Sequence, residues 1–565
     1  MKRNQVLTLL AAALLGVVVF GASQPAMAEL SKPMATISFS GHDPLMSDVD
    51  YVGKLGDNPD LAKVAEGFLT AATQGKGLDG LDKTRPWGAA LFANPTNPTE
   101  EPTVVLFIPV TDAKKLLAVL NEAGMETKDG ADGAVQIVLP DAPMELHAKQ
   151  IGTWAFVTNK KDQLGDMPSD PLAWLGGTET KYDIALRVIV KDIPETLRET
   201  FVQQLEFMFQ MAAMQSPNQA AAAQMQQAVE QIKRMANEID AITLGMAVND
   251  AAGKTYLDVE VTAVPGTQTA EDLARAKPAP SRMSGFYVPE ATLTLQSVAT
   301  MSEDDITRTV EAIKGAHEQF VAELANQDLP EEQLAKVKKV IGELVAIATK
   351  TVEGGKTDLG ASLWLDADKA AVVVRSLIVD GKKLEATLKE MLELAVAESP
   401  ELASMIQLNA AEFEGVALHT FSMPVPPVDN RETMVELIGE TVEAVVGTSD
   451  DGVYVAIGRD AMTKLKAALG ASKSAAAATV PPSRMSLAVT PLVRFIGKVV
   501  PSEEAKLQME MVAGMLEQAG SDNHVLMTVE PVANGMRQRI EFEQGILKVL
   551  GAVSKMATQG MEPMP

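Results

Sequence analysis

Short apolar runs recur in the same order along this chain, and that recurrence constrains its fold more than any other feature. Residues 87–120 read as strand, turn, strand and helix, and residues 360–388 read the same way. In both segments the second strand is a near-continuous apolar run, which is typical of a central strand. The sequence Asp-x-Lys-Lys-Leu follows each run, at Asp112 and at Asp380. An aspartate at that place is suited to cap the helix that comes next.

The correspondence between the two halves extends along the chain. The segment that begins at Gly152 matches the one at Gly452, and the segment at Tyr182 matches the one at Met485. A module of strand, helical stretch and hairpin is therefore predicted four times, beginning near Met34, Tyr182, Met283 and Met485. We predict an α+β fold in which antiparallel sheets are covered by long amphipathic helices and the module is internally duplicated. Generic alternation of helices and strands, without duplication, is the alternative.

A five-residue motif, Pro-Ser-Arg-Met-Ser, occurs twice, at residues 280–284 and 482–486. A proline-rich connection accompanies each copy. We interpret the motif as a lead-in that delivers the chain into the first strand of the third and fourth modules.

Period-2 alternation in residues 257–263 predicts one strand of a hairpin. Apolar side chains at Leu257, Val259 and Val261 alternate with polar side chains at Asp258 and Glu260. Such alternation is typical of a sheet that has one face in water, which places the polar row on the wet side.

The first residues have the pattern of an export signal. Lys2 and Arg3 give a positive start, and residues 6–20 are almost wholly apolar. Residues 26–28, Ala-Met-Ala, offer the small-x-small site that a signal peptidase needs. We expect cleavage after Ala28 and a periplasmic or secreted product. An uncleaved membrane anchor is the alternative, because the apolar run is close to the shortest that spans a bilayer.

Length and composition predict more than one domain behind the signal. The 565 residues include no cysteine, which excludes disulfides, thiolate metal sites and a lipid-modified cysteine. The chain must therefore be stabilised by its hydrophobic cores alone. We expect a signal peptide at residues 1–28, α+β repeat units at residues 29–278 and 279–557, and a flexible tail at residues 558–565. The two repeat units are expected to form separate lobes, and residues 470–483, rich in Ala and Ser, to be a linker.

Composition also limits the partners. A formal net charge of −26 repels nucleic acid and anionic lipid head groups. Aromatic residues make up only 4% of the chain, so stacking on sugars or bases has few side chains to use. No apolar stretch after the signal approaches the length of a membrane span. We expect a soluble protein whose partner is an unknown protein or an apolar ligand in the cell envelope.

No motif points to specific chemistry. No histidine has a second histidine two to four residues away, so paired metal-ligand spacing is absent among His42, His147, His317, His419 and His524. The acidic residues near His42 (Asp43, Asp48 and Asp50) fit no calcium loop and are interpreted as a solvated turn. Residues 75–80 satisfy G-x-G-x-x-G, but they follow a helix and predict a helix-ending loop. We therefore predict no catalytic residue, metal site or cofactor.

Methionine-rich helices offer one candidate binding surface, because methionine side chains adapt to varied apolar ligands. The candidate lining residues are Met208, Met211, Met214, Met509, Met511 and Met515. Ordinary core packing of these helical stripes is the alternative.

Three functions stay open on this basis. The first is a non-enzymatic envelope protein that binds a partner or serves structurally. The second is a carrier that holds an apolar, lipid-like ligand in a cleft between helix and sheet. The third is a hydrolase with dispersed active-site residues, which would need a histidine beside a serine or a carboxylate pair in a cleft.

The segment AAGKTYLDVEVTAVPGT from Ala251, after strand and helical stretch, resembles large exported bacterial proteins of unknown function. These proteins carry repeated α+β modules behind a signal peptide. The resemblance implies an envelope or secreted protein of similar architecture, and it transfers no catalytic or binding residue.

Overall fold

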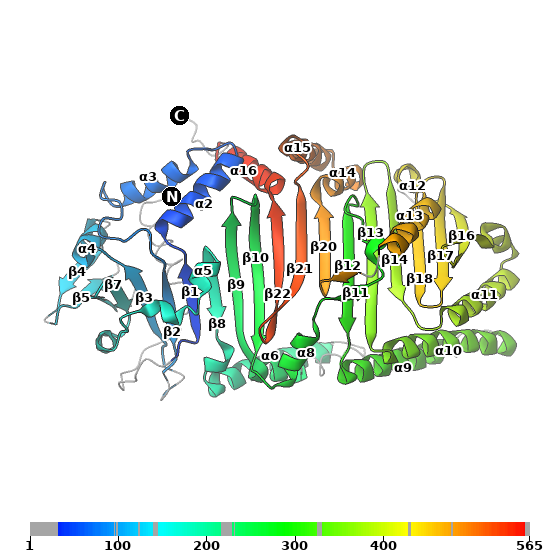
Figure 1. Ribbon diagram of the computed structural model, residues 1–565, viewed down its shortest axis with the longest axis horizontal. Coiled ribbons are helices and arrows are strands. Elements are labelled where there is room, and N and C mark those ends of the chain that lie inside the picture. The colour runs from blue at the N-terminus through cyan, green and yellow to red at the C-terminus, as the bar shows by residue number, and fades with distance from the viewer. Residues whose placement is uncertain are drawn as a thin grey trace. The chain divides into compact units, whose positions relative to one another are not determined.

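The computed structural model describes residues 32–559 apart from 95–96, 98–99, 123–124, 131, 139–144, 216–228, 231, 325–329, 428–430 and 476–477 (Figure 1). The predicted signal peptide and residues 560–565 of the predicted tail lie outside these residues. The described chain is α+β with antiparallel strands, as the sequence predicts. Its helices include none that is both long enough and apolar enough to cross a membrane.

Two compact units make up the chain. Unit 1 comprises the residues up to Leu273, together with Val532–Arg537 and the stretch from Leu550 onward. Unit 2 comprises Ala274–Pro531 and Gln538–Val549.

An antiparallel sheet organises unit 1. Its strands are β1 (Ala35–Phe39), β2 (Trp87–Phe92), β3 (Thr103–Pro109), β4 (Glu126–Asp129), β5 (Val135–Val138), β6 (Glu145–Ile151), β7 (Trp154–Thr158), β8 (Ile184–Val188), β9 (Ile239–Asn249) and β10 (Lys254–Ala263). Their pairings give the spatial order β4-β5-β6-β7-β3-β2-β1-β8-β9-β10. The antiparallel pair β1–β8 lies inside this order and joins its two parts.

Helices and short 3-10 turns connect these strands. They are α2 (His42–Leu55), α3 (Leu61–Ala72), α4 (Ala113–Glu122), η1 (Lys161–Gly165), η2 (Pro171–Trp174), α5 (Thr178–Lys181), η3 (Val190–Asp192), α6 (Glu195–Gln215) and α8 (Gln268–Arg275). The loop that follows α3 contains the G-x-G-x-x-G residues, so the prediction of a helix-ending loop is confirmed.

The sheet of unit 2 is likewise antiparallel. Its strands are β12 (Leu293–Thr300), β13 (Lys356–Leu365), β14 (Ala370–Leu377), β15 (Ile406–Phe413), β16 (Val416–Pro424), β17 (Thr441–Ser449), β18 (Gly452–Gly458), β20 (Ser483–Ala488) and β21 (His524–Val532). They pair in the order β15-β16-β17-β18-β14-β13-β12-β20-β21. A separate two-stranded ladder joins β11 (Ala279–Ser281) to β19 (Ala478–Val480). Strand β22 (Gly535–Glu543) follows β21 after a two-residue turn and begins in the residues assigned to unit 1.

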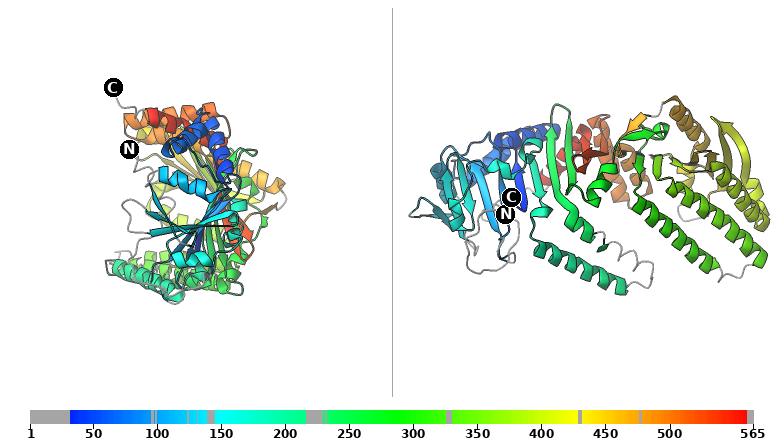
Figure 2. Two further views of the ribbon diagram at one scale, coloured as in Figure 1. Left: turned by 90° about the vertical axis from the view of Figure 1, so that its left-hand side faces the viewer. Right: turned by 60° about the horizontal axis from the view of Figure 1, so that its bottom comes forward.

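The helices and 3-10 turns of unit 2 differ in how they meet the sheet. They are η4 (Ser284–Phe286), α9 (Glu303–Leu324), α10 (Glu331–Glu353), α11 (Gly381–Glu398), η5 (Pro400–Met405), α12 (Arg431–Ile438), α13 (Ala461–Ser474), α14 (Val489–Val499) and α15 (Glu503–Ala519), and α16 (Gln544–Gln559) follows β22. The long helices α9 and α10 pack on each other and lie at one end of the strands (Figure 1 and Figure 2). Helix α13 packs on the sheet, whereas α11 packs on α10 and also contacts β17.

The nine strands of the unit 2 order match nine of the ten strands of unit 1, all but β10, when β12 is set against β1 and β20 against β8. In both units a strand, a helical stretch and a two-stranded segment occur twice, starting at β1 and β8 and at β12 and β20. The segments that the sequence aligned, from Gly152 and Gly452, contain the corresponding strands β7 and β18. Those from Tyr182 and Met485 contain or lie in β8 and β20, which also correspond.

Both predicted aspartate caps are confirmed. The Asp112 carboxylate accepts the backbone N–H groups of Lys114 and Lys115 at 2.9 and 3.3 Å, at the start of α4. The Asp380 carboxylate accepts the N–H of Lys383 at 3.4 Å, at the start of α11. The two caps thus begin corresponding helices of the two units.

The first Pro-Ser-Arg-Met-Ser copy does not lead into a strand of the main sheet, contrary to the prediction. Ser281 ends β11, a 3-10 turn follows, and β12 begins only at Leu293. The second copy does lead into a strand, because β20 begins at Ser483. The chain turns after Ser281 because the Ser281 hydroxyl donates to Asp358 at 2.7 Å and accepts from Gln296 at 2.8 Å.

The two copies of the motif are instead connected to each other. Gln296 donates to Ser281 of the first copy and accepts from Arg484 of the second at 2.8 Å. Strands β11 and β19, which lie at or just before the copies, also pair.

Two loop predictions are wrong. Residues 470–474 belong to α13 and residues 478–480 form β19, so the described part of residues 470–483 is not a plain linker. Helix α13 continues because Ala468 and Leu469 pack in the core of unit 2. The acidic residues near His42 lie in α2, not in a turn.

Candidate functional site

Among the described residues, unit 2 holds cavities of about 840, 570 and 390 Å³. They differ in chemistry, and two of them flank the same helix, α11.

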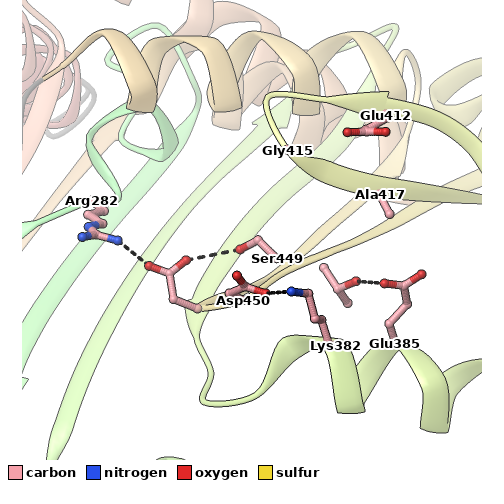
Figure 3. A pocket seen from close by; sticks show the side chains of 10 residues that line it. Arg282, Lys382, Glu385, Glu412, Gly415, Ala417, Ser449 and Asp450 are labelled. Atoms are coloured by element: carbon pink, nitrogen blue, oxygen red, sulfur yellow. Dashed lines mark hydrogen bonds and ion pairs between the residues drawn. The ribbon is translucent and has the colours of Figure 1, made fainter.

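The 570 Å³ cavity, called the polar cavity below, opens beside the first turns of α11, the β15–β16 hairpin and the β17–β18 turn (Figure 3). It is lined by Arg282, Lys382, Glu385, Glu412, Gly415, Ala417, Thr448, Ser449, Asp450 and Asp451. Glu412, Ala417 and Thr448 stand in one cross-strand row, so their side chains share a face of the sheet. The small Ala417 leaves the space between its two polar neighbours open.

Ion pairs occupy one end of the polar cavity. Arg282 Nη1 lies 2.5 Å from Asp451 Oδ2, and Lys382 Nζ lies 3.1 Å from Asp450 Oδ1. Asp451 also lies 3.5 Å from the buried guanidinium of Arg375. Arg282 belongs to the first Pro-Ser-Arg-Met-Ser copy, so that motif helps to line a cavity.

Carboxylates occupy the other end. Glu385 accepts from Lys389 at 2.5 Å and from the Thr448 hydroxyl at 3.3 Å. The hydrogen bond from Lys389 is the main reason that the pKa of Glu385 is lowered, so this carboxylate is ionised at neutral pH. Glu412 is exposed, and the described residues offer it no hydrogen-bond or ion-pair partner.

His419 lies beneath this carboxylate end, on β16. Its side chain is only 5% exposed, and its Nε2 lies 3.7 Å from Glu385 Oε1. Its Nδ1 accepts the backbone N–H of Asn409 at 3.0 Å, which places the ring proton on Nε2. Nε2 is buried without a hydrogen-bond partner, and burial is the main reason that the pKa of His419 is lowered. The imidazole is therefore neutral at pH 7 and points its N–H toward Glu385.

A break in the β15–β16 ladder creates the Asn409 contact. The register shifts between Gln407 and Ala411, and Asn409 adopts the left-handed region with a φ of 51°. Asparagine tolerates this conformation better than most residues. The bulge turns the Asn409 N–H away from the ladder and toward the histidine.

The 390 Å³ cavity, called the apolar cavity below, lies between the C-terminal half of α11 and the start of β15. It is lined by Leu392, Glu393, Val396, Ala397, Ala403, Ile406 and Leu408. Leu408 immediately precedes Asn409, so the apolar cavity begins beside the bulge that contacts His419.

The 840 Å³ cavity lies among α12, α14 and α15 and has charged walls. Lys498 pairs with Glu436 at 2.5 Å, and Arg494 pairs with Glu517. Gly497, Ala513 and Gly514 are among the residues that line it. Most of the positive charge in this cavity is thus used within the protein.

The central sheet of unit 1 exposes apolar side chains, which reverses the expectation for residues 257–263. The alternation is confirmed, but Leu257 and Val259 are 40% and 36% exposed, whereas Asp258 is 2% exposed. Leu186 and Leu244 on the neighbouring strands are 37% and 47% exposed. Two cross-strand rows of four share this apolar face: Ile37, Leu186, Leu244, Val259 and Phe39, Ile184, Met246, Leu257.

The covered face of the same strands is polar or small. Ser38 and Thr178 share a hydrogen bond of 2.9 Å, and the Tyr182 hydroxyl donates to Asp258 at 3.1 Å. A Cβ on Gly245 would lie 2.5 Å from the Tyr182 ring, so the aromatic ring requires glycine there. Burial is the main reason that the pKa of Tyr182 is raised, which keeps its hydroxyl a donor. Ser38 and Asp258 can lie inside because these partners satisfy them.

The candidate methionines fall on two helices that belong to different units. On α6, Met208 and Met211 are exposed, and the side chain of Met214 lies outside the described residues. On α15, Met509 and Met515 pack against a small hydrophobic core, and Met511 is exposed. None of the other five candidate methionines lines the three cavities described above.

The described residues contain no group of three or more histidines and carboxylates that could hold a metal ion. None of the five histidines lines the three cavities, although His419 approaches the polar one through Glu385. The grouping of Glu385, Glu412 and His419 could not be predicted from the sequence, because no local spacing links these residues. Only the long-range contact of α11 with the sheet brings them together.

Comparison with family models, with curated proteins and with solved structures found no match for this chain. The function is therefore argued from the geometry alone.

Proposed function

We propose that this protein is an exported, non-enzymatic binding protein of the cell envelope, and that it binds an apolar ligand. The apolar face on the central strands of unit 1 is the observation that carries the proposal. Its two rows of aliphatic and aromatic side chains face outward while serine, threonine and aspartate are buried behind them. Contiguous exposed apolar surface on a protein usually marks an interaction site.

The composition of this face favours an apolar ligand over a polar partner. Its neighbouring side chains are Leu, Ile, Val, Met and Phe, and every backbone group between them is used in strand pairing. The surface therefore offers dispersion contacts and few hydrogen-bonding groups. Phe207 and Met208 on α6 of the same unit are further exposed apolar side chains.

The hydrolase hypothesis finds less support. A general base needs a free imidazole nitrogen within reach of a nucleophile. In His419, Nδ1 accepts a backbone N–H, and Nε2 faces a carboxylate instead of a hydroxyl. The His524 ring contacts Glu543 at 3.0 Å, and none of its hydrogen-bond partners in the described part of the chain is a serine.

Export and internal duplication are part of the same proposal. The positively charged and then apolar N-terminus supports export, with cleavage after Ala28. The equal strand orders and the recurring strand–helix–hairpin module support an origin of both units from one ancestral module. A duplicated binding scaffold lets one unit change its surface while the other keeps it.

Native mass spectrometry of the mature protein, purified from its own envelope and then extracted with solvent, tests the proposal. We expect a bound apolar mass that is lost on extraction and is absent from Leu244→Glu. Leu507→Glu is the matched control, because Leu507 is a 67% exposed leucine on α15 of unit 2 and does not belong to the face, so this variant should keep the ligand. Wild-type protein that carries no such mass and also fails to bind a fluorescent apolar probe saturably would contradict the proposal.

A further inference from the structure

Two cavities of opposite chemistry lie along one seam in unit 2, between α11 and the β15–β16 hairpin. The polar cavity uses Glu385 near the start of α11, and the apolar cavity uses Leu392 and Val396 further along the same helix. Seven residues of helix separate Glu385 from Leu392, which corresponds to about 10 Å along the axis. On the hairpin, Leu408 and Glu412 belong to the apolar and polar cavities in the same order.

We propose that this seam binds a cationic amphiphile, a single aliphatic chain that carries an amine. The chain would occupy the apolar cavity, and the ammonium group would lie between the carboxylates of Glu385 and Glu412. This site goes beyond the proposed function, because it lies in unit 2 and does not involve the apolar face of unit 1.

The negative charge at this end of the polar cavity favours an amine as the head group of the ligand. Asp450 and Asp451 are already paired with Lys382 and Arg282, whereas Glu412 has no partner among the described residues. An anionic head group would meet Glu412 and Glu385 at the end of the polar cavity that adjoins the apolar one. An ammonium group would instead supply the partner that Glu412 lacks.

His419 lies behind Glu385 and forms no hydrogen bond with this carboxylate. It is a buried polar side chain whose Nε2 lacks a hydrogen-bond partner and faces Glu385, a wall of the polar cavity (Figure 3 shows this wall). At 3.7 Å the N–H lies too far from Glu385 Oε1 for a hydrogen bond. Among the described residues, Glu385 is therefore held by Lys389 and Thr448 alone, and an ammonium group in the cavity would find its unpaired carboxylate in Glu412.

The apolar cavity is suited to a chain and not to a bulky ring system. Its volume of about 390 Å³ is at the small end of ligand pockets, and its walls are aliphatic. Ala397 and Ala403 keep the space open, because larger side chains at these positions would fill it.

Titration calorimetry of the full mature chain with dodecylamine, below its micelle concentration, tests the proposal. The Leu244→Glu background removes binding to the apolar face of unit 1, so this site is measured alone. We expect saturable binding of one dodecylammonium per chain, at least tenfold tighter than the binding of dodecanoate. Equal affinity for the two probes, or no saturable binding of the amine, would overturn the proposal without touching the proposed function.

Three variants locate the site. Glu412→Gln should weaken dodecylammonium about fivefold, whereas Glu414→Gln, two residues away and outside the cavity, should leave it unchanged. Ala397→Phe fills the apolar cavity from an exposed position and should abolish binding with no loss of thermal stability. Unchanged affinity in both Glu412→Gln and Ala397→Phe, with melting temperatures equal to wild type, would show that the amine binds elsewhere.

Discussion

Unit 1 and unit 2 arrange their strands in the same order and fill the space on the sheet in different ways. After β7, unit 1 has three short helical elements, η1, η2 and the four-residue α5. Large aromatic side chains fill the core there, including Phe107, Trp154 and Phe156. After β18, unit 2 has the 14-residue helix α13, which supplies Leu465 and Ala468 to the core.

The strands of unit 2 that lie beneath α13 have smaller side chains than the corresponding strands of unit 1. Ala456 and Val373 are fully buried beneath it, where unit 1 carries aromatic rings on the corresponding strands β7 and β3. A close-packed interior has a fixed volume, so bulk that a helix supplies must be absent from the strands. The same order of strands is therefore compatible with two different cores: one filled by aromatic side chains of the strands, and one filled by a helix that packs on the sheet.

The largest effect is expected from the aromatic core of unit 1. Trp154 is 2% exposed and makes an edge-to-face contact with Phe107 at 6.0 Å. Trp154→Ala should reduce the free energy of unfolding of unit 1 by about 4 kcal/mol. Differential scanning calorimetry should show two transitions in wild type, of which only one moves in this variant.

Leu465→Ala is the matched change in unit 2 and should cost about 3 kcal/mol in the other transition. If both variants lowered the same transition, the two units would unfold as one cooperative body and the comparison would fail.

The second prediction concerns the central strand of each sheet. Gln296 on β12 is fully buried and links Ser281 to Arg484, so Gln296→Leu removes one hydrogen bond of the buried Ser281 and the side-chain acceptor of the half-buried Arg484. We expect a loss of about 2–3 kcal/mol. Ser38 on β1 has one side-chain partner, Thr178, and Ser38→Ala should cost about 1 kcal/mol. Urea unfolding measures the free energy of unfolding of both variants. Equal losses would show that the Gln296 network stabilises the protein no more than the single hydrogen bond of Ser38.

Acidification should move the two units in opposite directions. In unit 1, burial and then the neighbouring Asp183 raise the pKa of Asp48 to about 7. Between about pH 7 and pH 3.8, the ordinary pKa of an aspartate, Asp48 is protonated in the folded state and ionised in the unfolded state. Unit 1 therefore gains stability as the pH falls from 8 toward 5. In unit 2, burial and then Lys389 lower the pKa of His419, although Glu385 opposes them. As the pH falls below 6.5, the ordinary pKa of histidine, His419 is protonated in the unfolded state before it is protonated in the folded state. Unit 2 loses stability over that range.

Calorimetry at pH 8 and at pH 5.5 measures both transitions. From the higher to the lower of these two values, the melting temperature of unit 1 should rise and that of unit 2 should fall. Asp48→Asn should raise the melting temperature of unit 1 at pH 8 and have little effect at pH 5. His419→Gln should flatten the pH dependence of unit 2. Parallel movement of both transitions in wild type would count against these assignments.

The smallest effects concern the two capping aspartates. Asp112→Ala removes two hydrogen bonds at the start of α4 and should cost about 1 kcal/mol. Asp380 has a φ of 71°, so alanine there adds backbone strain to the lost cap, and Asp380→Ala should cost about 2 kcal/mol. Asp380→Gly should recover part of that loss because glycine adopts this conformation freely. A glycine variant less stable than the alanine variant would show that strain is not the difference.

Much of the local structure could be predicted from the sequence because its signals are local. Period-2 alternation identified the hairpin strand β10, and the aspartates that cap α4 and α11 lie where the residue pattern places them. Local signals failed where packing decides the outcome. The identical motif at residues 280–284 and 482–486 enters different structures, because only Ser281 has Asp358 beside it. Residues 470–474 continue a helix because the core of unit 2 holds α13.

The sequence by itself determined the alternation of side chains along each strand, the helix starts and the absence of cysteine chemistry, because each depends on neighbouring residues. The tertiary structure alone decided which face of a strand is covered. Alternation places Leu257 and Asp258 on opposite sides of the sheet, but burial of Asp258 depends on Tyr182, 76 residues away. The seam at Glu385, Glu412 and His419 has the same origin. Its residues share no sequence spacing, and they meet because α11 contacts a sheet assembled from distant strands.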